Sequence, residues 1–146
     1  MTSIPYLSNE WIVSLKVRFH TKLVSNCNIA HFTQGGDSHY RDRTPFIYVI
    51  ISPQRYHITS AVNGNANYIF DAGFDFALNQ WYHVEVHQRY VSGGNYRYFI
   101  IIDGVKVHEV LNSNAIPFYE VKVYLGSPFY PACPAVVKNF ELTNFL

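Results

Sequence analysis

Five side chains that can contact a ligand alternate along one predicted strand, so that they share one face of it: Trp81, His83, Glu85, His87 and Arg89. Successive members lie about 6.6 Å apart, because a strand rises about 3.3 Å per residue. A sugar-binding surface needs an aromatic plane for a pyranose ring beside charged or imidazole groups that hydrogen-bond hydroxyls. The row therefore predicts a carbohydrate-binding strand face, with a merely solvated outer sheet face as the alternative.

The same row predicts neither a metal centre nor a catalytic pair. His83 and His87 are about 13 Å apart along a strand, which is too far for one ion. Glycoside hydrolysis needs two carboxylates about 5 to 9 Å apart, and Glu85 has no partner in a Glu-x-Asp-x-x-Glu arrangement. The chain also lacks Gly-x-Ser-x-Gly, His-Glu-x-x-His and a phosphate-binding glycine loop. We therefore expect that the chain is not an enzyme.

A polar loop from Gly35 to Arg43 is the second candidate site, since long polar loops on a rigid scaffold often bind ligands. The candidate binding residues in this loop and in the Asn-Gly-Asn turn that follows are Asp37, His39, Arg41, Arg43, Asn63 and Asn65. Asp37 and Asp42 are weak candidates for a Ca²⁺ shell of oxygen ligands, and the alternative is that they only form turns. We expect no cofactor other than calcium.

Alternating apolar and polar residues predict strands along most of the chain. Asp103-Gly104 is a hairpin signal, because a type I′ turn needs positive φ at both central residues. About nine or ten short strands without an amphipathic helix indicate an antiparallel two-sheet sandwich. The predicted strand segments are 11–19, 26–32, 46–51, 55–62, 68–70, the hairpins within 80–110, 118–125 and 136–142.

Composition narrows the classes of protein. The 146 residues suit a single domain, 1–146, and the 17% aromatic and 14% charged residues suit half-buried pleated surfaces. A net charge of +1 gives no electrostatic surface for nucleic acid. No apolar run is long enough to insert into a membrane, and MTSIPYLSNE lacks the features of a secretory signal.

Cys27 and Cys133 lie near opposite ends of the chain. The first and last strands of a sandwich often neighbour each other. If the chain comes from an oxidising compartment, we therefore expect the two thiols to be close enough to bridge. Two unpaired buried thiols are the alternative.

Four segments carry a resemblance to a known family: 60–71, 79–88, 98–110 and 121–144. Together they resemble the laminin-G-like, concanavalin-A-like lectin/glucanase domains of invertebrate extracellular proteins, in which a Trp strand, an Ile-Asp-Gly hairpin and a closing VKVY…KNF pair recur in this order. The resemblance runs from about Asn9 onward and implies a jelly roll, an extracellular location, and ligands at the concave face or rim loops. A galectin is a related alternative, because Trp81, Glu85 and Arg89 share a strand face, but no His-x-Asn-Pro-Arg run precedes them.

Residues and resemblance together predict a non-enzymatic, lectin-like domain that recognises glycans on cell surfaces or in the matrix. Fold alone does not decide this, since the superfamily includes lectins, glycanases and adhesion modules. A protein-binding adhesion or oligomerisation module is the alternative, and for an oligomerisation module the partner would be a second copy of the chain, in a homo-oligomer. A glycoside hydrolase is the third hypothesis.

Overall fold

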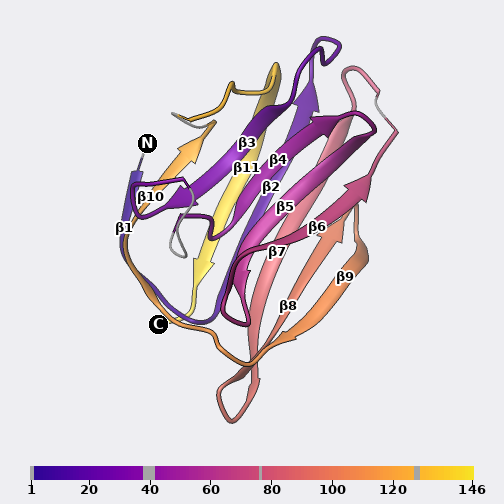
Figure 1. Ribbon diagram of the computed structural model, residues 1–146. Coiled ribbons are helices and arrows are strands. Elements are labelled where there is room, and N and C mark those ends of the chain that lie inside the picture. Colours follow the sequence, from indigo (N-terminus) through magenta and orange to yellow (C-terminus); the bar gives the residue numbers. More distant parts are fainter. Residues whose placement is uncertain (1, 38–41, 76, 127–128) are drawn as a thin grey trace.

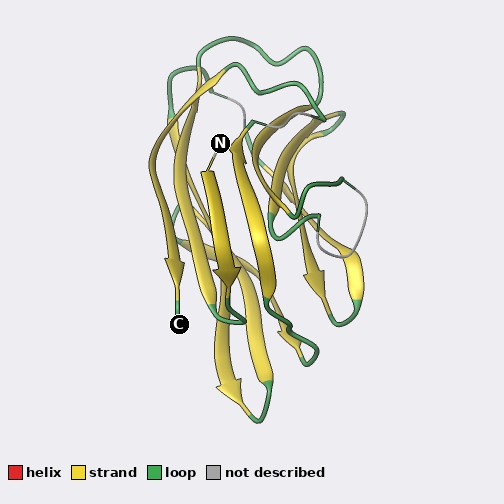
Figure 2. Ribbon diagram, turned by 90° about the vertical axis from the view of Figure 1, so that its left-hand side faces the viewer, coloured by secondary structure: helices red, strands yellow, loops and turns green. Residues whose placement is uncertain are grey.

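The computed structural model describes residues 2–37, 42–75, 77–126 and 129–146, and all regular elements within these ranges are β-strands (Figures 1 and 2). They contain no helix that is long and apolar enough to cross a membrane. The strands are β1 (Thr2–Leu7), β2 (Trp11–Phe19), β3 (Cys27–Thr33), β4 (Phe46–Ile51), β5 (Gln54–Val62), β6 (Asn65–Gly73), β7 (Trp81–Ser92), β8 (Asn95–Ile102), β9 (Val105–Asn112), β10 (Phe118–Leu125) and β11 (Ala135–Asn144).

The strands form two antiparallel sheets. Sheet A has the order β1-β10-β3-β4-β5-β6, and sheet B has the order β11-β2-β7-β8-β9. The predicted all-β fold with two antiparallel sheets is therefore confirmed. Each sheet mixes strands from both halves of the chain, so that β10 pairs with β3 and β11 pairs with β2 (Figure 1).

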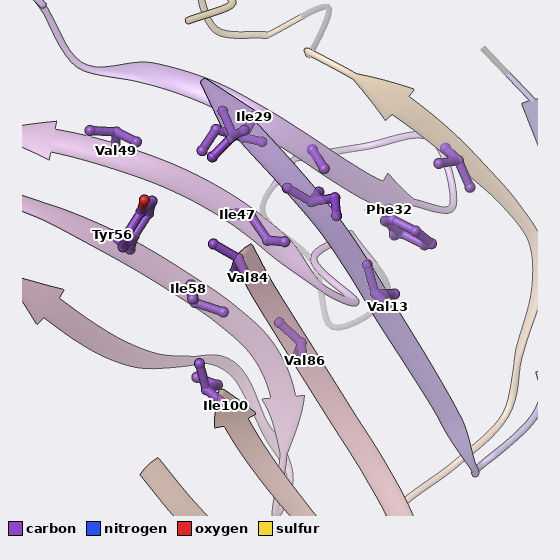
Figure 3. Close-up of a cluster of buried hydrophobic side chains, with 14 of the residues drawn as sticks. Val13, Ile29, Phe32, Ile47, Val49, Tyr56, Ile58, Val84, Val86 and Ile100 are labelled. Carbon is purple, nitrogen blue, oxygen red and sulfur yellow. The ribbon is translucent and has the colours of Figure 1, made fainter. Parts of the chain in front are cut away.

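The core lies between the sheets and follows the predicted alternation. In β2 every second residue is buried, from Trp11 to Phe19, and the residues between them are half-buried. β7 repeats this pattern with Val84 and Val86, which point into the core beside Ile58 and Ile100 (Figure 3). A strand whose two faces meet different surroundings keeps its register, because a slip by one residue would turn every apolar side chain outward.

The N-terminal strand β1 was not predicted from the sequence. It pairs with β10 at the edge of sheet A, from Thr2↔Val123 to Leu7↔Phe118. Most of its side chains are exposed. An edge strand of this kind has no alternating apolar face, so its sequence carries no periodic signal.

A disulfide joins Cys27 and Cys133, whose Cα atoms are 4.8 Å apart. The predicted proximity is confirmed, but the expected reason is wrong, because Cys27 begins β3 and Cys133 lies in the loop before β11. This loop runs beside the start of β3: Asn28 N donates to Pro131 O (2.8 Å), and Cys133 N donates to Asn28 O (3.0 Å). Backbone pairing thus brings the two cysteines together.

The β7–β8 hairpin extends beyond the end of the sandwich, at the bottom of Figure 1. On its inner face Gln88 and Tyr98 are 3% and 0% exposed. Tyr90 follows Gln88 on the same face and is 54% exposed, and its cross-strand neighbour Tyr96 is only half-buried. Two aromatic residues with the parity of core residues therefore lie where the opposing sheet no longer covers them.

Candidate functional site

All five residues of the predicted binding row lie half-buried on the outer face of sheet B. At one end of the row, the Trp81 ring has the Lys138 ammonium at 3.9 Å and the Arg18 guanidinium at 5.0 Å from its centroid. Neighbouring cations thus occupy positions over the indole ring that would receive a sugar.

The middle of the row is a chain of polar contacts. Ser14 Oγ and His83 Nε2 are 2.8 Å apart, and His87 Nε2 lies 3.2 Å from Glu85 Oε1. Burial lowers the pKa of His87, whose ring stacks on Phe99 at 4.5 Å. His83, Glu85 and His87 thus each have a polar partner on this face, whereas His87 Nδ1 has no hydrogen-bond partner among the described residues.

Ser14, His83 and Glu85 have the order of a nucleophile, a base and an orienting carboxylate. The distance from His83 Nδ1 to Glu85 Oε2 is 4.0 Å, which exceeds a hydrogen bond. A polar hollow of about 170 Å³ lies beside Ser14 and His83, next to the bulge in β11. Ser14 and His83 are therefore in hydrogen-bond contact, but His83 and Glu85 are not, so the three side chains do not form a catalytic triad in this structure.

The polar loop folds back on the outer face of sheet A. Arg43 Nε donates to the Asp37 carbonyl (2.8 Å), and its guanidinium lies 5.1 Å from the Phe46 ring centroid. Tyr130 Oη donates to Asp37 Oδ2 (2.6 Å), which raises the pKa of Tyr130. The polar loop and the loop before β11, which carries Tyr130, therefore hold each other in place over sheet A. The candidates His39 and Arg41 lie outside the described residues.

Asp42 is a structural residue of this loop. It is 4% exposed, and its Oδ1 accepts hydrogen bonds from Gly36 N (3.1 Å) and Thr33 Oγ1 (3.3 Å). A Cβ at Gly36 would lie 2.5 Å from Asp42 Oδ2, so a larger residue there would have to displace the Asp42 carboxylate. Among the described residues, no group of three or more His, Cys, Asp or Glu side chains could hold a metal ion. Calcium binding stays an untested prediction.

Asn63 and Asn65 lie at the β5–β6 turn. Asn63 has φ 53°, its amide donates to Leu111 O (2.8 Å), and its Oδ1 accepts from Ser113 N (2.8 Å). Asn65 Oδ1 accepts from Asn67 N (2.9 Å). Asn63 therefore joins the turn to the end of β9, and the structure does not bring these asparagines together with the polar loop.

A pocket that the sequence did not reveal lies beside the protruding hairpin. We call it the tyrosine pocket; it has a volume of about 260 Å³ and is lined by Tyr6, Ser8, Asn9, Glu10, Tyr90, Tyr96 and Phe145. Tyr90 and Tyr96 form an edge-to-face pair with ring centroids 5.6 Å apart. Aromatic surface continues past the pocket to Tyr119, 5.3 Å from Tyr6 and 57% exposed.

One residue of the pocket lining, Glu10, has a carboxylate side chain. Glu10 Oε2 accepts from Tyr90 N (3.0 Å) and from Arg89 Nε (3.1 Å). The Tyr90 backbone hydrogen bond, together with Arg89, lowers the pKa of Glu10. The Arg89 guanidinium also lies 4.4 Å from the Phe145 ring centroid. Glu10 is thus held ionised and in a fixed position.

Buried polar groups fix the turn that carries Glu10. Gln88 Nε2 donates to Asn9 O (2.8 Å), and Gln88 in turn accepts from Asn112 Nδ2 (2.9 Å). Ser8 Oγ donates to Glu10 O (2.7 Å). Since Gln88 and Asn112 are 3% and 0% exposed, the turn rests on the ordered interior and the pocket is formed before any ligand arrives.

A third hollow, of about 250 Å³, lies next to the disulfide, between Leu125 and Val137. Its lining is mainly aliphatic, and none of its lining residues is ionisable. Its one side-chain hydrogen-bonding group is the amide of Asn28, which is 1% exposed and has no hydrogen-bond partner among the described residues.

No family model and no curated protein matches this chain in sequence. Solved structures do match in fold. The native heptameric SAP-like pentraxin from Limulus polyphemus has a TM-score of 0.63 at 13% identity, over 97% of this chain and 66% of its own. An alginate lyase in complex with an alginate trisaccharide has a TM-score of 0.58 at 15% identity, over 99% and 73%. The carbohydrate-binding module CBM66 from Bacillus subtilis has 0.53 at 15%, over 94% and 76%.

The chain thus shares the two-sheet, concanavalin-A-like β-sandwich fold of these structures, as the resemblance implied, and it spans slightly less than two thirds of the pentraxin chain. The expectation that it is not an enzyme is wrong, because structures with this fold include alginate lyases. The absence of a glucanase carboxylate pattern argues only against glycoside hydrolysis by two carboxylates. It does not argue against the chemistry of a lyase.

Proposed function

We propose that this domain binds glycans and that the tyrosine pocket is the binding site. The observation that carries the proposal is a hollow of about 260 Å³ whose lining combines three tyrosines with Glu10, a carboxylate fixed by the Tyr90 backbone amide and by Arg89. Ligand pockets for drug-sized molecules measure roughly 300–1,000 Å³. A slightly smaller pocket with aromatic walls suits a single sugar ring.

The exposure of Tyr90 supports this site over the outer face of sheet B. A large aromatic side chain at 54% exposure loses hydrophobic stabilisation unless a partner covers it. In the predicted row, by contrast, Trp81 is flanked by cations and Glu85 is hydrogen-bonded to His87. The fold is also that of a carbohydrate-binding module.

A glycan array tests the proposal with matched variants from the two surfaces. Tyr90→Ala removes a ring contact of roughly 1–1.5 kcal/mol and should weaken binding about five- to twelvefold. Tyr90→Phe keeps the ring and should bind nearly as wild type. Glu85→Ala on the predicted row should leave the array pattern unchanged.

The reverse result, loss of binding in Glu85→Ala and retention in Tyr90→Ala, would move the site to the predicted row. A wild-type protein that binds no glycan on the array would overturn the proposed function itself.

We further propose that the domain works in an oxidising compartment such as the extracellular space. The disulfide supports this, because such bonds form and persist there and are rare in the cytosol. Mass analysis of protein from its native source, alkylated with and without reductant, provides the test. Two thiols that alkylate without reductant would contradict the proposal.

A further inference from the structure

We infer that the tyrosine pocket accepts sugar residues without a carboxylate, neutral or amino sugars, and rejects uronic acids. The inference rests on the proposed function and names the ligand class of the same site. It follows from the charge of the residues that line the pocket and from the contacts of the neighbouring Arg89.

Glu10 is the one acidic or basic side chain among the seven residues that line the pocket. The remaining lining side chains are phenol, hydroxyl, amide and phenyl groups, which carry hydrogen-bond donors or apolar surface without charge. Because its pKa is lowered, Glu10 is a carboxylate at neutral pH. The charge carried by the lining residues themselves is therefore negative.

Arg89 is the nearest cation in contact with Glu10, but it adds no positive charge to the lining of the pocket. Its Nε donates to Glu10, and its guanidinium lies against the Phe145 ring, so it is not part of the lining. A uronate in the pocket would therefore lie against a lining whose only charged side chain is the Glu10 carboxylate. Like charges brought together across an interface are a common way to exclude a wrong partner.

Sugar hydroxyls and amines, in contrast, are donors that suit a carboxylate. Glu10 Oε2 is occupied by Tyr90 N and Arg89, and in the part of the chain that the structure describes no hydrogen bond to Glu10 Oε1 is formed. A ligand hydroxyl that donates to Oε1 would form a charge-assisted hydrogen bond, which is stronger than one between neutral groups.

This inference separates the chain from structures that share its fold. Alginate is a chain of uronic acids, and the fold is shared with an alginate lyase solved with an alginate trisaccharide. The acidic lining of the tyrosine pocket is unsuited to such a polyanion. Two proteins with similar folds would therefore differ in the ligands they prefer: this chain would prefer uncharged or amino sugars, and the alginate lyase binds a uronate chain.

The experiment compares neutral, amino-sugar and alginate oligosaccharides on one array, followed by titration calorimetry with the tightest neutral ligand and an alginate trisaccharide. We expect wild type to prefer the neutral ligand at least tenfold. Glu10→Gln keeps the side-chain shape and removes the charge, so it should narrow that preference at least fivefold. Glu109→Gln is the matched control: Glu109 also accepts from an arginine, Arg97 (2.8 Å), but does not line the pocket, so this variant should behave as wild type.

A second readout needs no variant. Electrostatic repulsion is screened by salt, so alginate binding to wild type should strengthen as ionic strength rises, while binding of the neutral ligand should stay constant. Wild type that binds alginate as tightly as the neutral ligand, and loses it in Tyr90→Ala, would overturn the inference and leave the proposed function intact. Binding of no oligosaccharide, or binding that ignores Tyr90→Ala, would overturn both.

Discussion

Removal of the disulfide should lower the free energy of unfolding by about 4.8 kcal/mol at most. Cys27 and Cys133 are 106 positions apart, so the bond closes most of the chain into one loop. In the chain-entropy description, a loop of this size restricts the unfolded chain by about 16 cal/mol/K, which is about 4.8 kcal/mol at 25 °C. Domains are stable by roughly 5–15 kcal/mol in total, so this is a third of the stability or more.

The experiment is urea denaturation of the oxidised protein and of the double variant Cys27→Ala/Cys133→Ala. Alanine is chosen because Cys27 is 2% exposed, and serine would bury a hydroxyl without an assured partner. The dependence of the free energy on urea should also steepen, since an uncrosslinked chain exposes more surface on unfolding. A loss below about 1.5 kcal/mol with an unchanged slope would refute the entropic reasoning.

Four further outcomes are expected. Thermal and chemical unfolding should show one cooperative transition with β-type circular dichroism, and two separated transitions would contradict a single domain. Ile58→Ala, at a fully buried core position, should cost about 2–5 kcal/mol in urea titrations. Gly104→Ala, at φ 80°, should lower stability by about 1 kcal/mol, whereas an unchanged melting temperature would mean that the turn relaxes. The pKa of Glu10 is lower in the folded chain than in the unfolded chain. Ionised Glu10 therefore stabilises the fold above the unfolded pKa, and this contribution is lost as pH falls through the folded pKa. Denaturation between pH 7 and 3 should show the loss of this contribution in wild type and not in Glu10→Gln.

The sequence predicts those strands that have two different faces. In β2 and β7 one face meets the core and the other meets solvent, so parity alone identifies Leu15 and Val84 as core residues. β3 is different, since all seven of its residues are buried. Its outer face is covered by loops, as the contact of Phe129 with His31 shows, and no local pattern reveals which loop will fold back on which strand.

Whether a candidate site could be predicted from the sequence depends on whether its residues lie on one strand. The row from Trp81 to Arg89 lies on one strand, so its common face could be read from spacing. The tyrosine pocket combines residues from β1, the β1–β2 turn, β7, β8 and the C-terminus, which are distant in sequence. The alternation of inward and outward side chains along β7 would even assign Tyr90 to the core. The available signal was a pair of tyrosines flanking the Gly93-Gly94 turn, too close to a hairpin tip to remain under the opposing sheet.

The protruding β7–β8 hairpin changes how freely this protein can be re-engineered. Binding sites are commonly built from strained or internally packed residues, so that a gain in activity is set against a loss of robustness. Here Tyr90 and Tyr96 lie beyond the packed interior, while Gln88 and Tyr98, one step back along the same strands, remain within it. Randomising the two outer positions should therefore yield libraries in which most members fold and differ mainly in what they recognise.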